Sequence, residues 1–227
     1  HGLAARTVAS IFVNPAQFAP HEDFGAYPRQ EANDLELLQK AGCHLAYIPA
    51  GEDVYPAGFQ TSVAVSQVSQ GLCGASRPHF FGGVATVVCK LLNQVRPDFA
   101  IFGEKDYQQL LVIRRMVKDL NMPVEIIGAP IVREADGLAM SSRNAYLTAD
   151  ERTVAGRLNV ILREVSAKIA AGGAVGDAVS DGRRDLESAG FTRIDYLEVR
   201  TADALEPIDH GSIEKPSRVF AAVILGK

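Results

Sequence analysis

The sequence has few cysteines, and their spacing excludes two classes of site. Cys43, Cys73 and Cys89 lie 30 and 16 residues apart along the chain. Such separations match neither a disulfide scaffold nor the paired ligands of a structural zinc site. We therefore expect three separate thiols, buried or half-buried, as in proteins of a reducing compartment.

The sequence also lacks a long apolar run and an excess of positive charge. No stretch approaches the roughly 20 apolar residues that a membrane helix requires, and no signal peptide is recognisable at the start. The 23 basic and 27 acidic side chains give a net charge of −4, which disfavours general binding to nucleic acid or to an anionic membrane. We expect a cytoplasmic protein with no nucleic-acid or membrane partner, in which an anionic ligand would need a local group of cations.

Hydrophobic residues make up 47% of the chain, enough for a sizeable core. In the first part, apolar runs typical of strands alternate with helical patterns. The expected strands are 7–13, 44–48, 62–65, 99–102 and 124–127, and the expected helices are 31–41, 83–95 and 106–120. This alternation predicts an α/β fold, a Rossmann-like doubly wound parallel sheet, over residues 1–131.

The pattern changes in residues 132–227. Thr148 and Glu151 form a capping-box spacing that predicts one long helix to about residue 171, and a second helix is expected over 175–189. Residues 193–199 and 218–225 read as strands. Two helices followed by two strands predict a smaller α+β domain with an antiparallel sheet.

Polar residues follow several of the expected strands, where an open parallel sheet binds its ligands. The first strand leads to Asn14 and Gln17, and the strand ending at Gly103 leads to Lys105, Asp106 and Gln109. The strand 124–127 leads to Arg133 and the loop 136–144. We expect these three segments to meet at one edge of the sheet.

The residue types at this edge suit a phosphate-containing ligand. Lys105 and the loop Ser141-Ser142-Arg143 supply positive charge, hydroxyls and backbone N–H groups for charge that develops on phosphate. Gly103 would let a nucleotide approach the backbone closely. Asn14 and Gln17 are neutral hydrogen-bonding groups suited to a small hydroxy acid.

Each of these residues also has a structural alternative. Asp106 and Gln109 match a capping box, and Lys105 alone is typical of a solvated surface charge. The remaining alternatives are a plain turn at Asn14-Pro15, a plain loop at Ser141-Ser142 and a hairpin turn at Asp136-Gly137.

Five stretches resemble the diagnostic motifs of the pantothenate synthetase family, in the family's order and spacing. They are SIFVNPAQF (10–18), AYPR (26–29), ASRP (75–78), FGEKDYQQL (102–110) and READGLAMSSRN (133–144). The resemblance implies a nucleotidyltransferase-like Rossmann domain, a small C-terminal domain that closes over the site, a homodimer, and Mg²⁺ with ATP. It also implies a two-step ligation, in which pantoate is adenylated by ATP and the adenylate is then attacked by β-alanine.

The resemblance further implies the role of each motif residue. Pantoate would be held by Asn14, Gln17 and Gln109. Lys105 would contact an ATP phosphate and Asp106 the ribose or its neighbourhood. The implied ATP-binding set is Gly103, Lys105, Asp106, Val132, Met140, Ser141, Ser142 and Arg143, and the implied catalytic set is Lys105, Ser141, Ser142 and Arg143. No protein metal ligand is implied.

Two departures from the family pattern bear on activity. The family carries a strand and a His-x-Gly-His motif upstream of the segment that starts at Thr7, and the sequence has no match to them; a chain without those histidines is expected to adenylate very weakly. The usual R-P-G-H-F-R-G reads here as Arg77-Pro78-His79-Phe80-Phe81-Gly82-Gly83. Only Arg77 of that stretch is carried over as a site residue.

Two rival functions remain open. One is a related adenylyl-transferring enzyme that acts on a different hydroxy acid. The other is a catalytically impaired nucleotide-binding fragment, which the unmatched histidine motif motivates. A purely structural protein is disfavoured, since polar groups gathered at three strand ends would then lack a reason.

Overall fold

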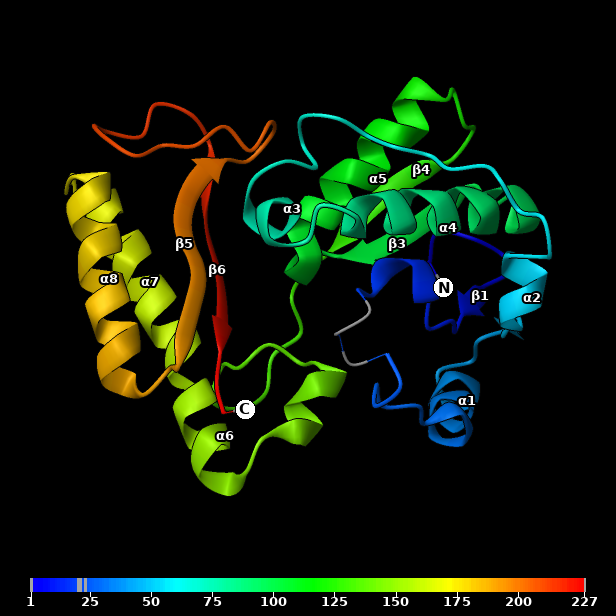
Figure 1. Cartoon of the computed structure of the whole chain (residues 1–227), viewed down its shortest axis with the longest axis horizontal. Coiled ribbons are helices and arrows are strands. Elements are labelled where there is room, and N and C mark those ends of the chain that lie inside the picture. The colour runs from blue at the N-terminus through cyan, green and yellow to red at the C-terminus, as the bar shows by residue number, and fades with distance from the viewer. Residues whose placement is uncertain (1, 20–21, 23, 227) are drawn as a thin grey trace. The chain divides into compact units, whose positions relative to one another are not determined.

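The computed structural model describes residues 2–19, 22 and 24–226. The chain divides into two compact units, residues 1–130 and 131–227. Figure 1 shows the elements of both units along the chain. Each unit builds its own hydrophobic core, and each is described separately below.

Four short strands of the first unit form two parallel pairs. Strand β1 (Val8–Ser10) pairs with β2 (Leu45–Tyr47), and β3 (Phe99–Gly103) pairs with β4 (Glu125–Ala129). A helix lies in the chain between the members of each pair, as parallel pairing requires. The predicted α/β class with parallel strands is therefore confirmed, although within the described residues the two pairs are not joined into one sheet.

Five helices belong to the first unit in its described part. They are α1 (Glu31–Lys40), α2 (Gly51–Val54), α3 (Leu72–Ser76), α4 (Phe80–Val95) and α5 (Tyr107–Asp119). Helix α4 is apolar on most sides and packs against α5, which in turn covers β3 and β4 (Figure 1). The core of this unit lies between α4 and α5.

The strand expected at residues 62–65 is not formed. The Val63 backbone N–H donates to the Thr86 hydroxyl of α4 at 2.9 Å rather than to a neighbouring strand. Val63 and Val65 pack on the core beside that helix. The β-branched residues of this segment are thus partly buried against a helix, which an apolar pattern alone cannot distinguish from strand pairing.

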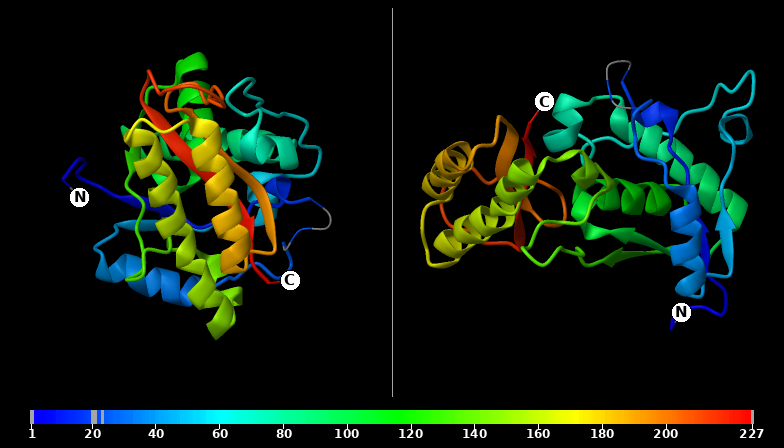
Figure 2. Two further views of the ribbon diagram at one scale, coloured as in Figure 1. Left: turned by 90° about the vertical axis from the view of Figure 1, so that its left-hand side faces the viewer. Right: turned by 90° about the horizontal axis from the view of Figure 1, so that it is seen from below.

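The second unit has the predicted α+β composition. Strands β5 (Arg193–Thr201) and β6 (Ser217–Ile224) pair antiparallel. Helices α7 (Arg157–Ala170) and α8 (Val175–Ala189) lie side by side over these strands (Figure 2). The bounds of α8 agree with the prediction.

The long helix expected from Thr148 to residue 171 is two helices, so that prediction is wrong in its length. Helix α6 (Ala149–Ala155) begins with the predicted capping box between Thr148 and Glu151 and ends before Gly156. A Cβ at Gly156 would lie 2.6 Å from a carboxylate oxygen of Asp136. The chain breaks its helix where this carboxylate packs against the backbone.

Cys43, Cys73 and Cys89 form no disulfide with one another and are half-buried, as expected. None of the helices in the described part of the chain is long and apolar enough to cross a membrane.

Candidate functional site

The segment after β1 forms a turn that Asn14 stabilises. Asn14 Oδ1 accepts a hydrogen bond from the Ala16 backbone N–H at 3.2 Å, and a short 3-10 turn follows over Pro15–Gln17. The turn alternative for Asn14-Pro15 is therefore correct, and it does not exclude a functional role. Asn14 is only 3% exposed, so its polar atoms must find partners within the protein.

Three further hydrogen bonds occupy the Asn14 side chain. Its Nδ2 donates to Gln17 Oε1 at 2.9 Å and to the Gly83 carbonyl at 3.1 Å. Its Oδ1 also accepts from the Tyr55 hydroxyl at 2.8 Å. The structure thus brings two predicted pantoate residues, Asn14 and Gln17, into direct contact. Of these, Gln17 retains an amide nitrogen that hydrogen-bonds to none of the described residues.

Gly83 of α4 provides the surface on which this turn rests. A Cβ at Gly83 would lie 2.4 Å from the Ala16 carbonyl oxygen and 3.0 Å from the Gln17 backbone nitrogen. The neighbouring Gly82 has nothing within 4 Å of the same position. Only glycine at position 83 lets the turn pack this closely on the helix.

Arg77 fixes the chain that leaves the turn. Its Nε donates to Glu22 Oε1 at 2.6 Å and its Nη2 to the Gln17 carbonyl at 3.0 Å. The guanidinium also stacks over the Phe80 ring, 4.1 Å from its centroid. The hydrogen bonds from Arg77 hold the pKa of Glu22 below its usual value. Arg77 is thus engaged with the protein itself, and Phe80, where the family motif has histidine, forms one side of its pocket.

The end of β3 presents exposed charge beside an open backbone. Lys105 Nζ lies 3.5 Å from Asp106 Oδ1, and the two side chains are 41% and 61% exposed. Asp106 precedes α5 but makes no side-chain capping bond, so the capping-box alternative is wrong. A Cβ at Gly103 would meet nothing within 4 Å. The protein's own packing therefore does not require glycine there.

Two adjacent glutamines in the first turn of α5 have opposite environments. Gln108 is 5% exposed; its Nε2 donates to the Val68, Gln70 and Gly71 carbonyls, and its Oε1 accepts from the Cys73 backbone N–H. Gln109, the predicted pantoate residue, is half-buried and makes no side-chain hydrogen bond within the described residues. Gln108 holds a neighbouring loop, whereas Gln109 remains available to a ligand.

The loop 132–140 of the second unit is a short hairpin. Arg133 and Ala139 form an antiparallel bridge, and Gly137 adopts a φ of 91° at the turn. The hairpin alternative for Asp136-Gly137 is therefore correct. Asp136 forms an ion pair with Arg152 of α6, whose hydrogen bonds lower the pKa of Asp136 to about 2. This pair anchors the hairpin to its own unit.

The predicted phosphate loop follows directly. Ser141 Oγ accepts from the Arg143 backbone N–H at 3.3 Å and begins a 3-10 turn over Ser142–Tyr146. Val132 and Met140, also predicted to bind ATP, are 66% and 52% exposed. All these residues belong to the second unit, so their meeting with Lys105 stays a prediction.

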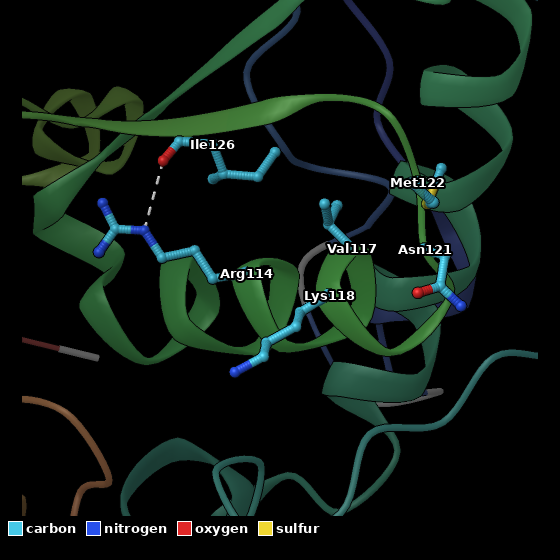
Figure 3. A pocket seen from close by; sticks show the side chains of 6 residues that line it. All are labelled: Arg114, Val117, Lys118, Asn121, Met122 and Ile126. Atoms are coloured by element: carbon cyan, nitrogen blue, oxygen red, sulfur yellow. Dashed lines mark hydrogen bonds between the residues drawn. The ribbon is translucent and has the colours of Figure 1, made fainter.

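A cavity in the first unit is lined by none of the site residues predicted in that unit. It has a volume of about 460 Å³ and is lined by Arg114, Val117, Lys118, Asn121, Met122 and Ile126. Figure 3 shows Arg114 reaching from α5 to the Ile126 carbonyl at 3.4 Å, with Lys118 pointing away from the strand. This cavity is at the start of β4, the opposite end from Gly103 and its partner Ala129. No group of three His, Cys, Asp or Glu side chains is placed to bind a metal among the described residues.

Sequence reasoning missed three residues that organise the first-unit site. Tyr55 ends helix α2, eight residues beyond β2, so the strand-end rule applied to residues 44–48 does not reach it. Gln108 lies one helical turn before Leu111 and Val112, which places it on the apolar face of α5. Gly83 matches the final glycine of the R-P-G-H-F-R-G pattern, whereas Gly82 stands where that pattern has arginine, and this difference is the signal that could have found it.

Comparisons with known proteins identify the family. The profile of a family described as pantoate-beta-alanine ligase matches residues 2–227. A pantothenate synthetase from Rhodospirillum rubrum is 55% identical over 222 residues, which cover 98% of this chain and 78% of the relative. A solved pantoate-beta-alanine ligase from Thermus thermophilus matches with a TM-score of 0.90 at 44% identity, over 97% of this chain and 82% of that one.

A third relative was solved with small molecules bound. The pantoate-beta-alanine ligase from Francisella tularensis, described as complexed with beta-gamma ATP and beta-alanine, matches with a TM-score of 0.78 at 29% identity. The match covers 98% of this chain and 80% of that one. With a family profile matched over nearly all of its length, the chain belongs to the pantoate–β-alanine ligase family.

Proposed function

We propose that the protein condenses pantoate with β-alanine in an ATP-dependent reaction that passes through pantoyl adenylate. A carboxylate oxygen of pantoate attacks the α-phosphorus of ATP, and the bond to the β-phosphate oxygen breaks to release pyrophosphate. The β-alanine amine then attacks the acyl carbon. The bond to AMP breaks, the amine loses a proton, and pantothenate and AMP leave.

The observation that carries this proposal is the 55% identity over 98% of the chain to a relative named pantothenate synthetase. Identity at that level favours the same acid substrate over an adenylyl transfer to a different hydroxy acid. The bound nucleotide and β-alanine in the Francisella relative support ATP and β-alanine as the other two substrates.

The pantoate side of the site is the turn after β1 together with the start of α5. Gln17 offers an amide nitrogen that the described residues leave without an acceptor, and Gln109 offers a complete amide. Amides can bind both the hydroxyl and carboxylate oxygens of pantoate without adding charge. Asn14 belongs to the same turn and contributes through the contacts described above.

The ATP side is the exposed end of β3. The open space in front of Gly103 supports close approach of a nucleotide to the backbone, since protein packing gives no other reason for glycine there. Lys105 would neutralise phosphate charge, and Asp106 would lie near the ribose. In-line displacement at phosphorus depends on such positioning and cationic stabilisation more than on a protein nucleophile.

The two units have different roles in this proposal. Residues 1–131 would bind ATP and pantoate, and residues 132–227 would form a lid that brings Val132, Met140 and Ser141-Ser142-Arg143 to the phosphates. A closing lid would also shield the adenylate from hydrolysis. The exposure of Val132, Met140, Ser142 and Arg143 suits a surface that acts only on closure.

The family resemblance also motivates Mg²⁺, a homodimer and a cytoplasmic location. Mg²⁺ commonly binds through substrate phosphates and water with one or two carboxylates, so a set of three protein ligands is not needed. Bound together with ATP, the ion would supply charge neutralisation at the phosphates without a protein ligand of its own.

The proposal is tested by measuring AMP formation from ATP, pantoate and β-alanine, with each substrate omitted in turn. We expect sustained AMP formation, at whatever rate the chain supports, only with all three substrates. Replacement of pantoate by other hydroxy acids should abolish the reaction. Equal turnover with another acid would support the related adenylyl-transferring enzyme, and ATP binding without any AMP formation would support the impaired nucleotide-binding protein.

A further inference from the structure

Tyr55, Asn14 and Gln17 form a continuous chain of hydrogen bonds in the first unit. The Tyr55 hydroxyl donates to Asn14 Oδ1 at 2.8 Å, and Asn14 Nδ2 donates to Gln17 Oε1 at 2.9 Å. Burial raises the pKa of Tyr55 above its usual value, against the opposing effect of its bond to Asn14. The hydroxyl therefore keeps its proton at neutral pH and remains a donor.

Two backbone groups fix the direction of this chain. The Ala16 N–H can only donate, so the Asn14 atom that faces it at 3.2 Å must be the oxygen. The Gly83 carbonyl can only accept, so the Asn14 atom that faces it at 3.1 Å must be the nitrogen. Side-chain amides can often be placed in either orientation, but here the backbone permits only one.

The orientation of Asn14 in turn decides that of Gln17. Because Asn14 presents its nitrogen, the Gln17 atom bonded to it must be the oxygen Oε1. The nitrogen Nε2 of Gln17 is then directed away from Asn14, with two N–H groups that no described residue accepts. The turn itself cannot rotate away, since its backbone rests on Gly83 and its Gln17 carbonyl is held by Arg77.

We propose that Tyr55 and Asn14 are positioning residues that hold Gln17 so that its amide presents only N–H donors to the acid substrate. This inference rests on the proposed function and changes the role of Asn14. Asn14, 3% exposed and bonded at both ends of its amide, acts through Gln17. The carboxylate and hydroxyl oxygens of pantoate match these donors, because each oxygen can accept.

The test is a double-mutant cycle on the KM for pantoate. Tyr55→Phe removes the hydroxyl but keeps the ring that packs against Phe59. We expect the KM for pantoate to rise about three- to tenfold, the equivalent of one hydrogen bond, with the KM for ATP unchanged. In a Gln17→Ala background, Tyr55→Phe should add no further increase, since its effect passes through Gln17.

Two other variants sharpen the result. Tyr47→Phe is the matched control, because the Tyr47 hydroxyl bonds to the exposed Gln94 side chain and should leave the KM for pantoate unchanged. Gln17→Glu keeps an acceptor for Asn14 but replaces the donors by a carboxylate oxygen. It should therefore raise the KM for pantoate by roughly 100-fold or more, the cost of leaving a half-buried charged oxygen opposite the substrate carboxylate, while the fold remains intact.

Contrary results are distinguishable. If the wild-type enzyme is active and Tyr55→Phe has no effect, or has its full effect in the Gln17→Ala background, the positioning role is wrong. If the wild-type enzyme makes no AMP with pantoate, the proposed function fails instead. The chain of bonds is then tested by NMR: Tyr55→Phe should shift the side-chain amide resonances of Asn14 and Gln17, Tyr47→Phe should not, and unshifted resonances overturn the inference.

Discussion

Replacing Gly83 by alanine should disturb both folding and pantoate binding, whereas the same change at Gly82 should do neither. A Cβ at position 83 would lie 2.4 Å from the Ala16 carbonyl oxygen and 2.7 Å from its carbon, well inside ordinary contact distance. The obstacle is backbone, so the turn must move. Overpacking of this kind costs about 1–3 kcal/mol, which the higher helix propensity of alanine offsets by roughly 1 kcal/mol.

The Gly82→Ala variant isolates the propensity effect, because position 82 opens to free space. We expect it to stabilise the protein by up to about 1 kcal/mol, so the two variants should differ by roughly 1–3 kcal/mol in the free energy of unfolding. Since a displacement of about 1 Å can cost about 100-fold in rate, Gly83→Ala should also lower kcat/KM for pantoate. Denaturant unfolding and steady-state kinetics measure both effects, and equal behaviour of the two variants would refute the packing of the turn on α4.

Three further changes test other parts of the structure. Lys105→Ala should lower the adenylation rate about 100-fold or more by removing a phosphate contact. The control Lys118→Ala, in the cavity at the far end of α5, should leave the adenylation rate unchanged. A near-normal rate for Lys105→Ala would count against the role of Lys105. Gln108→Ala should destabilise the protein by about 2–4 kcal/mol in denaturant unfolding, because buried carbonyls lose their donor. Gln109→Ala should instead retain stability and lose pantoate affinity. The opposite pattern would reverse the structural role of Gln108 and the ligand role of Gln109. An unfolded aspartate carboxyl has a pKa of about 3.9. At pH values above this pKa, Asp136→Asn should lower Tm. Because the folded pKa is lowered to about 2, the stabilising effect is lost as pH falls between these values, and a Tm difference that grows on acidification would contradict the ion pair.

Local signals in the sequence predicted much of the fold. The bounds of α8 and the capping box of α6 depend on neighbouring residues and were found correctly. The errors occur where tertiary contacts decide. Val63 and Val65 are strand-like but pack partly buried on the core beside α4, and the Asp136 carboxylate, distant in sequence, lies against Gly156 where α6 ends.

The candidate site shows the same division. The rule that ligands bind at strand ends identified the turn at Asn14 and the charges at Lys105 from the order of elements alone. It could not show that Asn14 is saturated by its neighbours while Gln17 is not, because that depends on Tyr55 and on the Gly83 carbonyl in three dimensions. Residue identity predicted which groups could form the site, and hydrogen-bond partners decide which of them can reach a ligand.

The central claim is that the protein activates pantoate by forming an adenylate at the end of β3. The most direct measurement is exchange of labelled pyrophosphate into ATP without β-alanine, because only a reversible adenylation step produces it. We expect exchange that requires pantoate, stops with other hydroxy acids and is lost in Lys105→Ala. Exchange that proceeds without pantoate, or survives in Lys105→Ala, would contradict the account.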